Sequence, residues 1–134
     1  MKSRQAGFTM IELIVVIVIL GILAATALPK FIDMREEAQQ AAVDGVAGAA
    51  ASAMTLNYSG CSLTNNVVTA NKCVQVNNCQ DVASLLQGGL PKIDSSTNYE
   101  VGDDAIASNG ATVTCTVTGQ NGKTAEFTGI GAAI

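Results

Sequence analysis

The sequence predicts an α+β fold, in which a long N-terminal helix has its apolar half projecting and its amphipathic half packed on a small antiparallel sheet of about three strands. Three observations predict it. An apolar run fills residues 8–28, a helical period follows to about residue 57, and alternating strand-like residues stand only near the end. With 134 residues, the chain has room for one ordinary domain beside the apolar run.

The apolar run has the length of a membrane-spanning helix. Only Glu12 is charged between Phe8 and Leu28, and this stretch as a helix spans about 30 Å, which is enough to cross the hydrocarbon core of a bilayer. Lys2 and Arg4 precede the run. The positive-inside rule therefore places the N-terminus in the cytoplasm and the residues after the run across the membrane.

Three interpretations of this segment compete. It has the basic start and apolar core of an ordinary secretory signal peptide, with residues 25–27 (Ala-Thr-Ala) resembling a cleavage site. It also fits a plain transmembrane anchor. Neither accounts for Glu12 inside the run, where a charge near the membrane centre costs roughly 2.5–3.5 kcal/mol. A third interpretation, a specialised precursor signal, accounts both for Glu12 and for Gly7-Phe8-Thr9 at the junction between the leader and the apolar run.

The helical pattern continues beyond Pro29. Because proline lacks an N–H and its ring crowds the carbonyl of Ala25, we expect a kink at the membrane exit. The helix is expected to end near Asn57–Gly60, where a glycine closes the pattern. Apolar residues spaced by three or four predict the face that packs on the sheet, namely Phe31, Met34, Ala38, Ala42, Val46, Ala49, Ala53 and Leu56.

A connecting region, residues 61–98, precedes the strands. It contains a predicted short helix over 79–87, capped by Asn77 or Asn78. Glycines at 119 and 122 predict the turn of a hairpin. The predicted strands are 99–101, 112–118 and 123–130, with Val113, Cys115, Val117, Ala125 and Phe127 facing inward.

The four cysteines all lie in the polar region, at Cys61, Cys73, Cys79 and Cys115. None of them has C-x-x-C spacing, and an even count behind an export segment favours two disulfides in an oxidising compartment. Three pairings are possible. We favour Cys61–Cys73, which would close a local loop, and Cys79–Cys115, which would tie the connecting helix to the sheet.

Residues 7–13, Gly-Phe-Thr-Met-Ile-Glu-Leu, resemble the class III signal of type IV prepilins. The resemblance implies that a prepilin peptidase/N-methyltransferase removes residues 1–7 as a leader and methylates Phe8. It further implies a transmembrane and filament-core half over 8–29 and a globular pilin head over 30–134. Residues 21–33 and 43–49 are similar to the mannose-sensitive haemagglutinin branch of type IVa pilins.

The same resemblance assigns an assembly role to Glu12. In that family, the glutamate of an incoming subunit is thought to meet the N-terminal amine of its neighbour. Pairing with its own Phe8 amine, four residues away on the same helix face, is the alternative, and the sequence does not separate the two. The resemblance also implies that the helix loses order in the filament between Gly21 and Pro29.

The implied function is that of the major structural subunit of a type IV pilus, a homopolymer for adhesion, surface attachment or motility. The precursor would sit in the inner membrane, with a cytoplasmic N-terminus and a periplasmic head, until inner-membrane assembly machinery moves it into an extracellular filament. The alternative is a pseudopilin or minor pilin of a type II secretion or pilus assembly system.

Composition argues against other classes of function. A net charge of -4 disfavours general nucleic-acid binding. The absence of histidine removes the commonest general base and the commonest zinc ligand. The sequence also lacks a glycine-rich phosphate loop. We therefore expect no cofactor, no metal site and no enzymatic activity.

Overall fold

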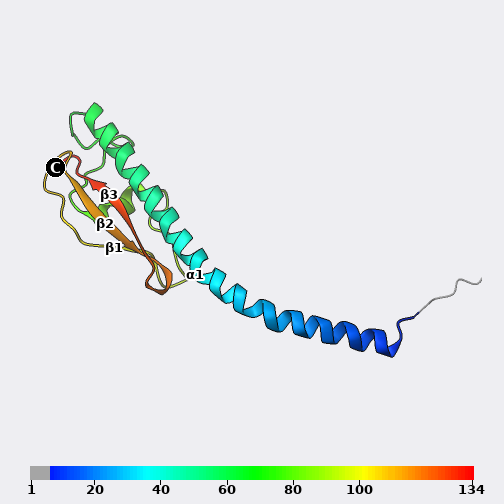
Figure 1. Ribbon diagram of the computed structural model, residues 1–134. Coiled ribbons are helices and arrows are strands. Elements are labelled where there is room, and N and C mark those ends of the chain that lie inside the picture. Colours follow the sequence, from blue (N-terminus) through cyan, green and yellow to red (C-terminus); the bar gives the residue numbers. More distant parts are fainter. Residues whose placement is uncertain (1–6) are drawn as a thin grey trace, which may run out of the picture. The chain divides into compact units, whose positions relative to one another are not determined.

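A computed structural model of the chain describes residues 7–134, without the side chains of residues 31–33. The chain divides into two compact units, Met1–Glu37 and Ala38–Ile134, and the second is called the head unit below. The expected border between the membrane and filament-core segment, which ends at residue 29, and the pilin head, which begins at residue 30, stays a prediction. The elements are α1 (Met10–Leu63), η1 (Cys79–Asp81), α2 (Val82–Leu85), β1 (Glu100–Val101), β2 (Thr112–Thr118), η2 (Gln120–Gly122) and β3 (Thr124–Ile130) (Figure 1).

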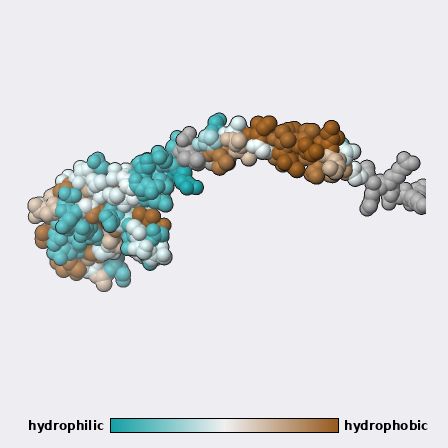
Figure 2. All heavy atoms as spheres, turned by 90° about the horizontal axis from the view of Figure 1, so that it is seen from below, coloured by the Kyte–Doolittle hydropathy of each residue, from teal (hydrophilic) through white to brown (hydrophobic). Residues whose placement is uncertain are grey.

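The first unit contains the apolar part of α1. Every residue from Gly7 to Lys30 is exposed, and Figure 2 shows a nearly continuous hydrophobic surface over this part of the helix. The hydroxyl of Thr26 donates to the carbonyls of Ile22 and Leu23, at 3.2 and 3.0 Å. Because this bond satisfies the hydroxyl within the helix, Thr26 leaves no unpaired polar group in the apolar stretch.

The head unit contains an antiparallel sheet in the order β1-β2-β3. Opposite Phe127 of β3 lies Cys115 of β2, and opposite Ala125 lies Val117. Cys115, Val117 and Phe127 are buried, as the alternation of the sequence predicts. Together with the long helix, the sheet confirms the predicted α+β class, and β2 has the predicted bounds.

The face of α1 that enters the core differs from the predicted face. The predicted stripe is only partly covered in the head unit, where Ala42 and Ala49 are exposed and Leu56 is 73% exposed. Its Val46 is half-buried and packs against the edge of the core. From Gly45 to Leu56 most side chains are small, so two apolar stripes one residue apart fit the helical period equally well. The stripe that is buried carries the disulfide-bonded Cys61, and comprises Val43, Ala47, Ala50, Met54, Asn57 and Cys61.

The predicted end of the helix is also wrong, because α1 continues through Gly60 to Leu63. A Cβ on Gly60 would collide with the backbone carbonyl oxygen of Lys72. The glycine therefore allows the following loop to approach the helix and does not terminate it. The extra turn places Cys61 on the buried face, where it bonds to Cys73 at a Cα–Cα distance of 4.6 Å.

Asn57 fastens this loop to α1. Its side-chain amide donates to the carbonyl of Val74 at 2.8 Å, and its carbonyl oxygen accepts from the N–H of Val74 at 2.8 Å. The side chain thus pairs with the Val74 backbone as a neighbouring strand would. Asn57 is only 8% exposed whereas Val74 is 36% exposed, so both bonds are partly shielded from water.

Replacing Asn57 with alanine should destabilise the head unit by roughly 1–3 kcal/mol, because two backbone groups of Val74 lose their partner at a partly buried position. Urea unfolding of the full chain in detergent, followed by circular dichroism, measures the change. Ser59→Ala is the matched control on the same helix, since Ser59 is exposed and bonds only back to Thr55. A loss no greater than that of the control would contradict this role for Asn57.

The connecting helix is shorter than predicted. It is split into η1 and α2, and the N-terminus is capped by Asn78, which accepts from the N–H of Gln80 at 2.9 Å and forms a capping box with Asp81. Between η1 and β1, a turn is organised by Asp94, whose carboxylate accepts hydrogen bonds from Ser96 and Thr97. The backbone N–H of Ser96, aided by the other donors, lowers the pKa of Asp94 to about 2.

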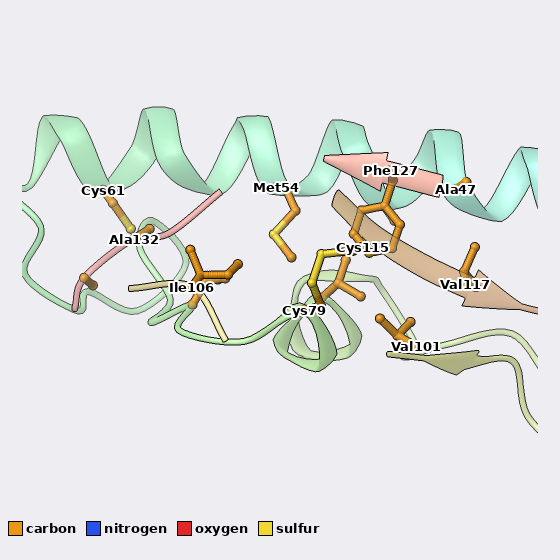
Figure 3. Close-up of a cluster of buried hydrophobic side chains, with 14 of the residues drawn as sticks. Ala47, Met54, Cys61, Cys79, Val101, Ile106, Cys115, Val117, Phe127 and Ala132 are labelled. Atoms are coloured by element: carbon orange, nitrogen blue, oxygen red, sulfur yellow. A yellow bond between two sulfur atoms is a disulfide. The ribbon is translucent and has the colours of Figure 1, made fainter. Parts of the chain in front are cut away.

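The second disulfide lies at the centre of the core. It joins Cys79 of η1 to Cys115 of β2, and both residues are fully buried. Figure 3 shows this bridge facing Met54 of α1, beside Phe127. A Cβ on Gly129 would lie 2.5 Å from the sulfur of Cys115, so the glycine makes room for the bridge. The four cysteines thus form the favoured pairing in the structure.

Candidate processing and assembly site

The residues before α1 form an accessible extended segment. Gly7 and Phe8 precede the first helical residue, Met10, and Phe8 is 87% exposed. No described atom lies within 4 Å of the position that a Cβ on Gly7 would occupy. Packing within the described chain therefore does not require glycine at this position. Lys2 and Arg4 fall outside the described residues.

Thr9 and Glu12 form a reciprocal cap at the start of α1. The carboxylate of Glu12 accepts from the N–H of Thr9 at 2.8 Å and from its hydroxyl at 3.0 Å. In return, the N–H of Glu12 donates to the Thr9 hydroxyl at 3.3 Å. This arrangement is a capping box, which satisfies backbone donors that the first turn of a helix leaves unpaired.

The capping box gives Glu12 a partner that the sequence reasoning missed. The signal was present, because Thr9 and Glu12 have the Thr-x-x-Glu spacing of a capping box just before an apolar run. In the uncut chain, the nitrogen of Phe8 is still part of the peptide bond to Gly7. The two expected pairings of Glu12 with an N-terminal amine both concern the chain after cleavage.

The apolar part of α1 has the properties of a membrane-spanning helix. Among the described residues, α1 is the one helix long and apolar enough to cross a membrane. Gly21 has no described atom within 4 Å of a Cβ position, and Pro29 lies inside the continuous helix. No group of three or more acidic or cysteine side chains able to hold a metal is found in the described part of the chain.

Comparisons with known proteins agree with these features. Residues 2–28 match the family model described as a prokaryotic N-terminal methylation motif. The chain is 53% identical over 53 residues to a type IV narrow pilus major component, PilA5, of Thermus thermophilus, covering 40% of this chain and 46% of that protein. It is 54% identical over 39 residues to the type II secretion system core protein G of Aeromonas hydrophila, covering 29% and 27%.

A third relative is matched over most of its length. Fimbrial protein Q of Moraxella bovis is 30% identical over 115 residues, which are 86% of this chain and 70% of that protein. The first curated relatives are matched over less than half of their own length. No solved structure matches the chain. The N-terminal motif, the long helix on a small antiparallel sheet and the extended match to a fimbrial protein together show that the chain belongs to the type IV pilin family.

Proposed function

We propose that the chain is the repeated structural subunit of a type IV pilus. The observation that carries this proposal is an apolar helix, exposed on every side from Gly7 to Lys30, whose only charge up to Leu28 is Glu12. Such a surface needs an apolar environment in the precursor and in the polymer. A bilayer supplies it before assembly, and the helices of other copies supply it afterwards.

The processing step follows from the start of the chain. We propose cleavage after Gly7 by a prepilin peptidase/N-methyltransferase, which leaves a methylated Phe8 as the new N-terminus. Accessibility of Phe8 and the absence of a packing reason for Gly7 support this assignment. Residues 1–7 are then the leader, 8–29 the membrane and filament-core segment, and 30–134 the head.

The assembly step uses the charge of Glu12. Lipid and a filament core are both apolar, so little hydrophobic free energy separates the two states of the helix, and packing and polar contacts decide between them. The amine of Phe8 in a neighbouring subunit is the proposed partner of Glu12. In the filament, this contact would replace the hydrogen bonds that the Glu12 carboxylate accepts from Thr9. Unwinding between Gly21 and Pro29 is a further proposal for the filament state.

The location of the protein is proposed to change on assembly. The precursor is proposed to sit in the inner membrane with its N-terminus in the cytoplasm and its head in the periplasm, where the two disulfides form. Inner-membrane assembly machinery then moves it into an extracellular filament that serves adhesion, attachment or motility.

Mass spectrometry of fibres sheared from the cell surface tests this proposal. The expected subunit begins at N-methylated Phe8 and retains the whole apolar segment. A mature protein that begins at Leu28, as a free monomer, would overturn it in favour of an ordinary signal peptide.

The second candidate is a pseudopilin of a secretion system, which the match to core protein G favours. Deleting the gene separates the two candidates. Loss of surface fibres with normal protein secretion supports the pilus subunit, whereas loss of secretion without loss of fibres supports the pseudopilin.

A further inference from the structure

The predicted stripe of α1, which the core covers only in part, lines a pocket on the head unit. The pocket has a volume of about 310 Å³ and lies between α1 and the segment that follows α2. Its lining carries no charged side chain. We call it the α1 pocket, and its main lining residues are Ala42, Gly45, Val46, Ala49, Leu86 and Pro91.

Three exposed aliphatic side chains lie at the other end of the same part of α1 and in the loop that follows it. Leu63, Val67 and Val68 are 87%, 62% and 61% exposed, and all three belong to the segment closed by the Cys61–Cys73 disulfide. We call these three side chains the apolar knob. Three large aliphatic side chains exposed within one short disulfide-closed segment are candidates for an interaction site.

The loop that carries the knob is internally braced. The carbonyl of Cys61 accepts from the N–H groups of Thr64 and Asn66 at 3.1 and 2.7 Å. At the other end, Thr69 and Cys73 exchange two backbone hydrogen bonds, each of 2.9 Å. A braced loop loses little conformational entropy when it binds, so the knob is preorganised for docking.

Knob and pocket are matched in polarity. The sequence contains no charged residue from Gly45 to Asn71, a stretch that includes the knob and the middle of the pocket floor. The pocket lining and the knob are themselves uncharged, so a direct contact between them would bury apolar area without pairing a charge with an apolar surface.

We propose that the apolar knob of one copy inserts into the α1 pocket of a second copy. This inference rests on the proposed filament function and names a head-to-head contact within it. Gly45 and Cys61 lie 16 positions apart on α1, which is about 24 Å along the helix axis. Since the two surfaces are different and well separated, the contact is heterologous and can repeat without closing on itself.

The small size of the knob favours a second copy over a free partner. Three side chains are far fewer than the roughly 20–30 residues a side of a stable protein interface. A contact of this size holds only when another contact keeps the partners together. Copies anchored side by side through their apolar helices meet that condition.

Filling the pocket tests the contact without harming the fold. A side chain on Gly45 or Gly48 meets no described atom within 4 Å of its Cβ, and both positions are helical, where leucine is a better residue than glycine. Gly45→Leu fills the α1 pocket, and Gly48→Leu is the matched control because Gly48 does not line it. Both full-length variants should retain or raise the melting temperature of the head unit.

The expected result is a loss of sheared filament yield of about tenfold or more for Gly45→Leu, with Gly48→Leu close to wild type. Leu63→Ser should match Gly45→Leu, while Ala70→Ser, an exposed change in the same loop, should not. In an otherwise wild-type chain, Val67→Cys places a thiol on the knob and Gln87→Cys places one at the pocket. Filaments of the double variant should give a ladder of disulfide-linked oligomers, and filaments of either single variant should not.

The outcomes separate this contact from the proposed function. Wild-type cells without filaments would overturn both. Filaments from Gly45→Leu at wild-type yield, or the absence of a ladder, would overturn the contact alone. Equal losses from Gly45→Leu and Gly48→Leu would also overturn it, and would indicate that an apolar helix of another copy covers the whole outer face of α1.

Discussion

Replacing Glu12 with alanine is expected to leave membrane insertion intact and to abolish or strongly reduce filament assembly. Insertion should not suffer, because the change removes the only charge of the apolar run, which costs up to roughly 2.5–3.5 kcal/mol near the membrane centre. Assembly should suffer, because the carboxylate is the proposed partner of the amine at Phe8 of a neighbouring subunit.

The capping box complicates a simple interpretation of that variant. Glu12→Ala removes both the charge and the bonds with Thr9, and loss of a cap alone costs about 0.5–2 kcal/mol of helix stability. Glu12→Gln separates the two effects. Glutamine keeps the capping box and has no charge.

If the charge drives assembly, Glu12→Gln should be as defective as Glu12→Ala, while Thr9→Val, which keeps the charge and loses the side-chain cap, should assemble. Filament yield from sheared cells and the amount of full-length protein in the inner membrane are the two measurements. Normal filaments from Glu12→Ala would exclude an assembly role for the carboxylate, and full recovery by Glu12→Gln would assign that role to the cap.

Strands were easier to predict from the sequence than the helix face. The Thr-Val-Thr-Cys pattern of β2 has only one period and one possible buried side, so its bounds and its inward residues follow directly. On α1 the small residues from Gly45 to Leu56 permit two stripes, and only the partners of Met54 and Cys61 in three dimensions select between them. The predicted stripe, which the core covers only in part, is the one that lines the α1 pocket.

Long-range backbone contacts explain the other differences. Gly60 reads as a helix stop, yet it is needed for the close approach of Lys72, a residue twelve positions later. Asn57 reads as a helix-ending polar residue, yet it pairs with the backbone of Val74. At the candidate site, the Thr9–Glu12 cap was local and visible in the sequence, because both partners lie within one helical turn.

Removing the central disulfide is expected to have the largest effect on the stability of the head. The loop closed by Cys79 and Cys115 spans 36 positions, against 12 for Cys61 and Cys73. On the chain-entropy account, these lengths correspond to roughly 4 and 3 kcal/mol. The double variant Cys79→Ala/Cys115→Ala should lower the melting temperature by roughly 15–30 °C for a unit of this size.

The more informative result is which of the two disulfides costs more stability when it is removed. Core packing and chain entropy both predict the larger loss for Cys79–Cys115. The Cys79–Cys115 bridge faces Met54 in the core and occupies the space next to Gly129, so its loss also leaves a cavity in the core. The Cys61–Cys73 loop stays attached to α1 through Asn57 when its disulfide is absent. Thermal unfolding of both double variants, as full-length chains in detergent, compares the two directly. A larger loss from the Cys61–Cys73 pair would mean that the braced loop, and not the bridge beneath α1, limits the stability of the head.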